Sequence, residues 1–279
     1  MWRHVAPVRG ALFGRHLFRG LAQMPSPALV LVDGQQKVDL VRAQLSLRLA
    51  ANAQGVDVLV AGKQGVAIAL RAVAQLREDK GRPPSAFHFA KVGSKELQQA
   101  ELSLLGHGIR HGDEDPPDDV GLGRHGFRLS ILPASASSSQ VMDPAAALDA
   151  PVARVLRISG GSGQFLQLAK AIATEVARLP DGSVAAVETT LKGKSKNVWA
   201  RMYRMALAVA QAHHWQVAPA NDKLVTRRFR CIAEERQSED LVFNTGDIGD
   251  GDIVGTSDLR VLRLTFIPED PRPVARDPA

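Results

Sequence analysis

The chain has 279 residues, of which 45% are hydrophobic and 23% charged, a composition typical of a globular protein with one large domain or two ordinary ones. No apolar run approaches the roughly 18 residues of a membrane-spanning helix, so we expect a soluble protein, and the single cysteine, Cys231, excludes intrachain disulfides. The formal net charge of +6 favours an anionic partner.

The amino-terminal segment, residues 1–24, is rich in arginine and has no acidic residue. Its four arginines are Arg3, Arg9, Arg15 and Arg19. They interrupt every apolar stretch, so the segment lacks the continuous hydrophobic core of a secretory signal. This composition is typical of a mitochondrial transit peptide, and we expect the protein in the mitochondrial matrix. The alternative is a basic arm that stays on the mature protein and contacts nucleic acid.

The next part of the chain has the pattern of alternating strands and helices. A short apolar strand precedes a helix whose apolar side chains recur at helical spacing. Gly55 then leads into a second strand, and Gly62-Lys63 opens a second helix with Val66, Leu70 and Val73 on one face. The strands expected in this first copy of a repeat are 29–32, 56–60, 86–92 and 127–132.

A second copy follows at an offset of 127 residues, which places Gly55 on Gly182. At the same offset the helical stripe of Val38, Val41, Leu45 and Leu49 falls on Phe165, Leu168, Ile172 and Val176. After a short insertion the offset becomes 131, so that Gly193-Lys194 corresponds to Gly62-Lys63. The strands expected in the second copy are 156–159, 183–187, 224–233 and 259–267.

The order β-α-β-α-β-β, read twice, predicts an α+β protein. We expect two tandem two-layer domains, 28–133 and 151–270, each with both helices on one face of a mixed sheet. Residues 134–150 have the small-residue, proline-containing composition of a linker, and 271–279 form a carboxyl-terminal tail.

Charge is distributed unevenly within each copy. Residues 151–230 contain 13 lysines and arginines against 4 acidic residues, whereas 231–270 contain 3 against 10. The first copy repeats the contrast more weakly, and its acids gather in 112–121 as those of the second copy gather in 246–258. We interpret both acidic segments as solvated hairpin connections, with contact to a basic protein or a metal ion as the alternative.

The sequence LKGKSKNVWAR, 191–201, predicts an anion site. Lys192, Lys194 and Lys196 alternate across a turn, with Asn197 and Arg201 on the helix that follows. The unpaired N–H groups and partial positive charge of the helix amino terminus add to the attraction for phosphate. The alternative is a solvated surface turn without a ligand.

Other candidate sites are weaker. Gly193-Lys194-Ser195 matches the end of a nucleotide-binding P-loop, but Glu188 stands where that loop needs its first glycine, so we do not expect nucleotide hydrolysis. His213 and His214 lack the spacing of a zinc pair and are expected to cap the second helix. Only 5% of residues are aromatic, so we expect no base-stacking platform.

The segment 155–209 resembles the Alba domain and its bacterial sporulation-protein-S relatives, most clearly in VLRIS, 155–159, and in LTFIPED, 264–270. The resemblance covers most of 153–270 and, more faintly, 28–133. It implies DNA or RNA binding without catalysis, a dimeric arrangement, and a nucleic-acid face built from two turns and the terminal hairpin.

The resemblance also assigns residues to that face. The first turn is 161–164, with Gln164, and the second holds the lysines of 191–201. The corresponding first-copy site holds Lys63 and Gln64, with Lys37 beside it. The arginines at the hairpin base that could reach a nucleic-acid backbone are Arg227, Arg228 and Arg230.

We therefore expect a non-catalytic RNA-binding subunit of a mitochondrial ribonucleoprotein, with the mitochondrial ribosome favoured, and with no cofactor and no metal. The two copies are expected to pair within the chain as a pseudo-dimer or with other subunits. The alternatives are an organellar DNA-binding architectural protein, and a protein-assembly module that binds no nucleic acid.

Overall fold

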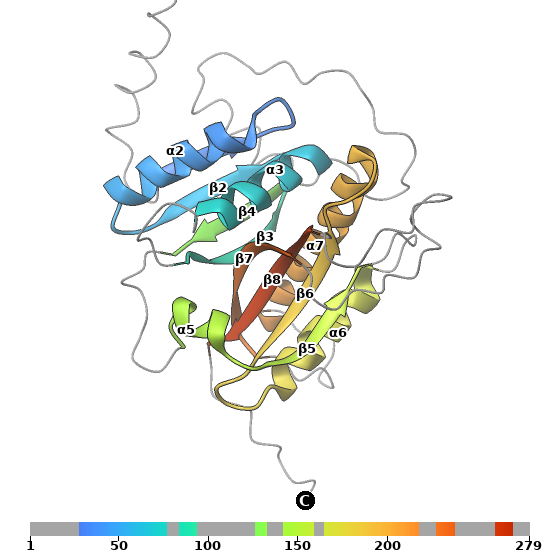
Figure 1. Ribbon diagram of the computed structural model, residues 1–279. Coiled ribbons are helices and arrows are strands. Elements are labelled where there is room, and N and C mark those ends of the chain that lie inside the picture. Colours follow the sequence, from blue (N-terminus) through green and yellow to red (C-terminus); the bar gives the residue numbers. More distant parts are fainter. Residues whose placement is uncertain are drawn as a thin grey trace, which may run out of the picture.

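Figure 1 shows the computed structural model of the chain, which describes residues 28–76, 84–93, 126–132, 142–158, 165–217, 227–237 and 260–269. The first copy contains β1 (Ala28–Val32), α2 (Val38–Ala51), β2 (Val56–Val60), α3 (Gly62–Gln75), β3 (Ala86–Val92) and β4 (Gly126–Ile131). The second contains β5 (Val152–Arg157), α6 (Phe165–Arg178), β6 (Val184–Thr190), α7 (Ser195–Val217), β7 (Phe229–Gln237) and β8 (Arg260–Pro268). A short helix, α5 (Pro144–Asp149), lies between the copies.

The predicted repeat of β-α-β-α-β-β is confirmed in these elements. Helices α2 and α6 have 14 residues each and begin at the two positions that the offset relates. Gly55 and Gly182 both have positive φ, 95° and 79°, and so do Gly62 at 71° and Gly193 at 117°. Since only glycine adopts this region at little cost, the matched glycines mark the same backbone turns in both copies.

The two copies share one mixed sheet of eight strands, in the order β1-β2-β4-β3-β7-β8-β6-β5. The outer pairs, β1 with β2 and β5 with β6, are parallel, and every inner pair is antiparallel. The copies meet where β3 pairs with β7 through Ala86 with Ile232 and Phe87 with Cys231. Pairing within the chain, one of the two arrangements expected, is therefore what the structure has.

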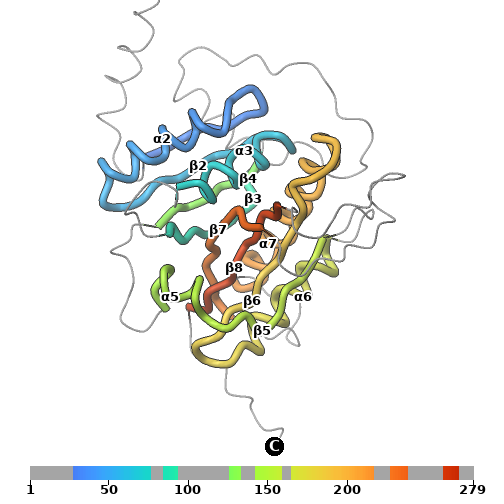
Figure 2. Tube along the Cα trace, in the orientation of Figure 1, coloured from blue at the N-terminus to red at the C-terminus, as the bar shows by residue number. Residues whose placement is uncertain are grey.

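Four helices cover one face of the sheet. Alternate strand residues such as Val58, Phe89 and Leu264 form one buried apolar cluster with side chains of α2, α3, α6 and α7. Strand residues of the opposite parity, including Ile232, pack against Ala147 of α5 in a second cluster. Figure 2 shows α5 on the near side of the second copy's strands, with α6 and α7 behind them. The prediction that both helices of each copy lie on one face is confirmed.

Several predicted boundaries differ from the structure. Part of the expected linker is helical because Asp143 caps α5, accepting a hydrogen bond from the Ala145 N–H at 2.6 Å, and Ala147 is buried against the sheet. Strand β5 begins at Val152, four residues before the predicted start, and β7 begins at Phe229 rather than at 224. Among the helices of the described residues, none combines the length and apolarity needed to cross a bilayer.

His213 lies inside the junction of the two copies, so the capping interpretation is wrong for this residue, whereas His214 does lie in the last turn of α7. Helix α7 continues to Val217, and the His213 ring stacks on Phe229 at 4.1 Å. Its Nδ1 accepts from the Phe89 N–H at 3.2 Å and its Nε2 donates to the Phe229 carbonyl at 2.9 Å. The ring thus bridges β3 and β7 beyond their paired residues. Burial lowers the pKa of His213 to about 4, which keeps the ring neutral at pH 7.

Candidate nucleic-acid interface

The basic turn connects the end of β6 to the start of α7, as predicted. Lys192, Lys194, Lys196 and Asn197 are all exposed. The Lys194 carbonyl accepts hydrogen bonds from the N–H groups of Asn197 at 2.9 Å and Val198 at 3.2 Å, so the helix begins directly behind the lysines. Among the described residues, no hydrogen bond or ion pair to the ammonium groups of these three lysines is found. They are placed to meet an anion from solvent.

Arg201 shapes this turn from behind instead of facing a ligand. Its side chain is only 7% exposed, and its Nη2 donates to the carbonyls of Thr190 at 3.1 Å and Lys192 at 2.8 Å. Gly193, directly after Lys192, bends the chain with a φ of 117°. Because the guanidinium is turned inward onto the backbone, the assignment of Arg201 as a nucleic-acid contact is not supported, and we regard it as a positioning residue.

The arginines of the hairpin base do not join the turn. The strand register places 228–230 beside the start of β6, whereas the lysines follow its end. Arg227 is buried and donates to the Leu179 carbonyl at 3.0 Å and to Asp181 at 3.2 Å. Arg230 is 3% exposed, donates to the Met142 carbonyl at 2.6 Å, and has its pKa lowered by burial. Only Arg228 of the three is exposed.

The first-copy residues assemble at the opposite edge of the sheet. Lys37 is exposed and its carbonyl accepts from the N–H groups at the start of α2. Gln64 packs so closely on Gly34 that a Cβ there would lie 3.2 Å from it. Since β1 and β2 are parallel, the Lys37 turn and the Lys63-Gln64 turn follow the carboxyl ends of neighbouring strands and lie at the same end of the sheet. Successive antiparallel pairings from β2 to β6 make these two strands antiparallel, so the turns of the two copies face opposite ways. Gln164 lies outside the described residues.

Sequence reasoning missed two arginines that the fold brings to the second-copy turn. Arg260 begins β8, is exposed, and accepts at its carbonyl from the Leu191 N–H at 2.9 Å. Arg71 comes from α3 of the first copy and donates to Glu235 at 2.6 Å. Neither is close in sequence to the turn, and only the strand register and the packing of α3 on α7 would have identified them.

Among the described residues near the turn, two carboxylates are paired with arginines. Glu188, buried near the end of β6, forms an ion pair with Arg263, and Glu235 is paired with Arg71. These pairs neutralise the acids locally, so the positive field of the exposed lysines is not cancelled by them. The arrangement is able to bind a polyanion. Among the described residues, no three of the histidine, cysteine, aspartate and glutamate side chains are grouped to hold a metal ion.

No protein-family model matches this chain, and neither a curated protein nor a solved structure is significantly similar to it.

Proposed function

We propose that the protein binds the sugar-phosphate backbone of RNA through the basic turn of its second copy, as a non-catalytic subunit of a mitochondrial ribonucleoprotein. The observation that carries this proposal is the exposure of Lys192, Lys194 and Lys196 on a turn whose backbone is held from behind by Arg201. The Alba resemblance of the same segment supports the choice of nucleic acid as the polyanion.

The geometry favours backbone contact over sequence readout. Lysine ammonium groups act as point charges that follow phosphates, and the helix amino terminus adds N–H donors to the same anion. A rigid turn loses less conformational entropy on binding than a flexible arm, which favours a fixed position in an assembly. The arginine-rich 1–24 segment motivates the mitochondrial setting, and the mitochondrial ribosome is the assembly that we favour.

The test is the salt dependence of RNA affinity for the full chain and for the triple variant Lys192→Ala, Lys194→Ala, Lys196→Ala. Each phosphate contact contributes about 0.7 to 0.9 to the slope of log affinity against log salt, so loss of three contacts reduces the slope by about two to three. The matched control removes three exposed cations of the second copy that are assigned to no nucleic-acid contact, Arg154→Ala, Lys170→Ala and Arg178→Ala. An equal reduction in both variants would show that net charge, and not the turn, decides binding.

The proposed preference for RNA over DNA needs a separate experiment. Competition between structured RNA and duplex DNA of equal length, at one salt concentration, is expected to favour RNA. A clear preference for duplex DNA would instead support an architectural role on organellar DNA. If neither nucleic acid binds, the assembly-module alternative becomes the better account.

A further inference from the structure

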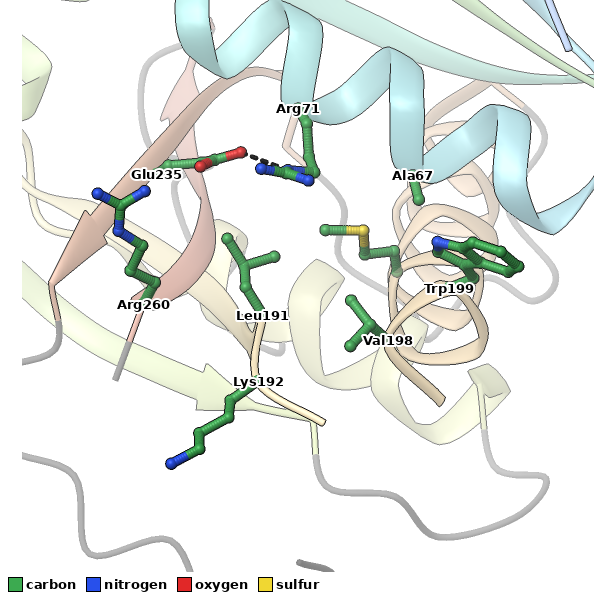
Figure 3. A pocket seen from close by; sticks show the side chains of 9 residues that line it. Ala67, Arg71, Leu191, Lys192, Val198, Trp199, Glu235 and Arg260 are labelled. Carbon is green, nitrogen blue, oxygen red and sulfur yellow. Dashed lines mark hydrogen bonds and ion pairs between the residues drawn. The ribbon is translucent and has the colours of Figure 1, made fainter. Parts of the chain in front are cut away.

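A pocket lies beside the basic turn, between the two copies. Its volume is about 320 Å³, and it is lined by Ala67 and Arg71 of α3, Leu191 and Lys192 of the turn, Val198, Trp199 and Met202 of α7, Glu235 of β7 and Arg260 of β8. Figure 3 shows the Trp199 indole beside Ala67, with the Arg71 guanidinium turned toward Glu235. Both copies contribute lining residues, so the pocket exists only because the copies pair within the chain.

The lining is apolar at its base and cationic at its rim. Ala67, Val198 and Met202 are buried, and the indole of Trp199 is half-buried. Lys192 and Arg260 at the rim are exposed. An apolar base with a few convergent polar groups is the usual form of a site for a small ring system, and the volume lies at the lower end of the range for ligand pockets.

We propose that this pocket takes one unpaired nucleobase of the RNA strand whose phosphates lie on the lysine turn, with the base stacked on Trp199. The inference rests on the proposed function and deepens it, because it adds recognition of single-stranded RNA to backbone binding. It departs from the expectation, drawn from the 5% aromatic content, that the chain has no base-stacking platform. Lys192 belongs to both the turn and the pocket rim, so a phosphate on the turn brings its own base to the pocket opening.

The charges inside the pocket favour a neutral ring over a phosphate. Among the described residues that line it, Glu235 is the one carboxylate; its side chain is 8% exposed and accepts hydrogen bonds from Arg71 at 2.6 Å and Gln75 at 3.4 Å. This pairing offsets the Arg71 charge, so little positive charge remains inside the pocket to attract a phosphate. A phosphate that entered would therefore not recover the free energy that it loses on leaving water. An aromatic base has no such cost, and every base offers a face to the indole.

The experiment compares a single-stranded 12-nucleotide RNA with an abasic ribose-phosphate strand of equal length, both bound by the full chain at one salt concentration. We expect the base-containing strand to bind at least about fivefold more tightly, the lower end of the effect of one stacked base. Two variants should abolish the preference: Trp199→Leu removes the stacking face, and Ala67→Leu fills the pocket. Trp199→Phe keeps an aromatic face and should keep the preference.

The matched control is Trp215→Leu, which removes a half-buried tryptophan elsewhere in α7. It should leave the preference unchanged, and thermal unfolding of each variant identifies any that fails to fold. Equal affinity of the unmodified protein for both strands, or a preference that survives both pocket substitutions, would overturn the inference while leaving the lysine turn in place. Binding of neither strand would instead overturn the proposed function.

Discussion

The two copies of the repeat have the same backbone and different surfaces. Leu45 of α2 and Ile172 of α6 correspond, and both are fully buried. On the outer sides of the same helices, the exposed Leu40 and Leu47 correspond to Gln167 and Thr174. The core therefore repeats because each helix must cover the same kind of sheet, whereas nothing in the fold requires the outer sides to match.

The turns before the second helices differ in the same way. Gly62 and Gly193 both adopt positive φ. In the first copy this turn carries Lys63 and Gln64 and opens a 14-residue helix, whereas in the second it carries three exposed lysines and opens a 23-residue helix. The extra length of α7 brings His213 between β3 and β7. In our account the first copy completes the sheet and one wall of the pocket, and the second copy carries the nucleic-acid contact.

The largest effect should come from the shared core. Leu45→Ala and Ile172→Ala remove equivalent buried side chains, and each should lower the free energy of unfolding by about 2 to 5 kcal/mol. Leu47→Ala, at a position 64% exposed, should change it by less than about 0.5 kcal/mol. Denaturant titration measures all three. A loss confined to one of the two buried positions would contradict an equivalent role for the two helices.

His213 of the second copy should make the free energy of unfolding depend on pH. The pKa of its imidazole is about 4 in the folded protein and near 6.5 when unfolded. Between these values the unfolded chain binds more protons, so stability is fully present above about pH 6.5 and falls as pH is lowered toward 4, by about 3 kcal/mol.

His213→Gln should be less stable at pH 7 and should lose less on acidification. The control is His214→Gln, since His214 is the exposed neighbour. Denaturant titrations at pH 7, 5.5 and 4 follow both variants. Parallel pH dependence of His213→Gln and the unmodified chain would show that other groups cause the acid sensitivity.

The matched glycines should separate stability from binding. Gly62→Ala and Gly193→Ala each force a side chain into the left-handed region, at a cost of about 1 to 2 kcal/mol. Only Gly193→Ala should also weaken RNA binding, because it distorts the turn that holds Lys192 and Lys194. Equal loss of RNA affinity in both variants would indicate that both copies contact the RNA.

Local patterns predicted much of this fold. The apolar stripes of α2 and α6 repeat at helical spacing, and glycines mark the turns, so these elements could be read from neighbouring residues. The joining of β3 to β7 could not, because it depends on pairs about 145 residues apart, Phe87 with Cys231 and Ala86 with Ile232. Helix α5 had local signals in Asp143 and Pro144, but the small-residue composition around them resembled a linker.

The parts of the candidate site that depend on neighbouring residues were predicted, and the parts that depend on distant residues were not. The exposed lysines and the start of α7 follow from sequence spacing. Whether an arginine faces solvent or the backbone depends on packing, so Arg201 and Arg227 could not be told from Arg228 in the sequence. The pocket also depends on α3, which reaches the turn only through the pairing of the two copies.

The most direct test of the central claim is photo-crosslinking of the full chain to bound RNA, followed by mass spectrometry of the peptides. We expect crosslinks within 191–201, including Trp199, and none in 61–66, the first-copy counterpart of 192–197. Crosslinks confined to 61–66, or found only outside both segments, would contradict the assignment of nucleic-acid contact to the second copy.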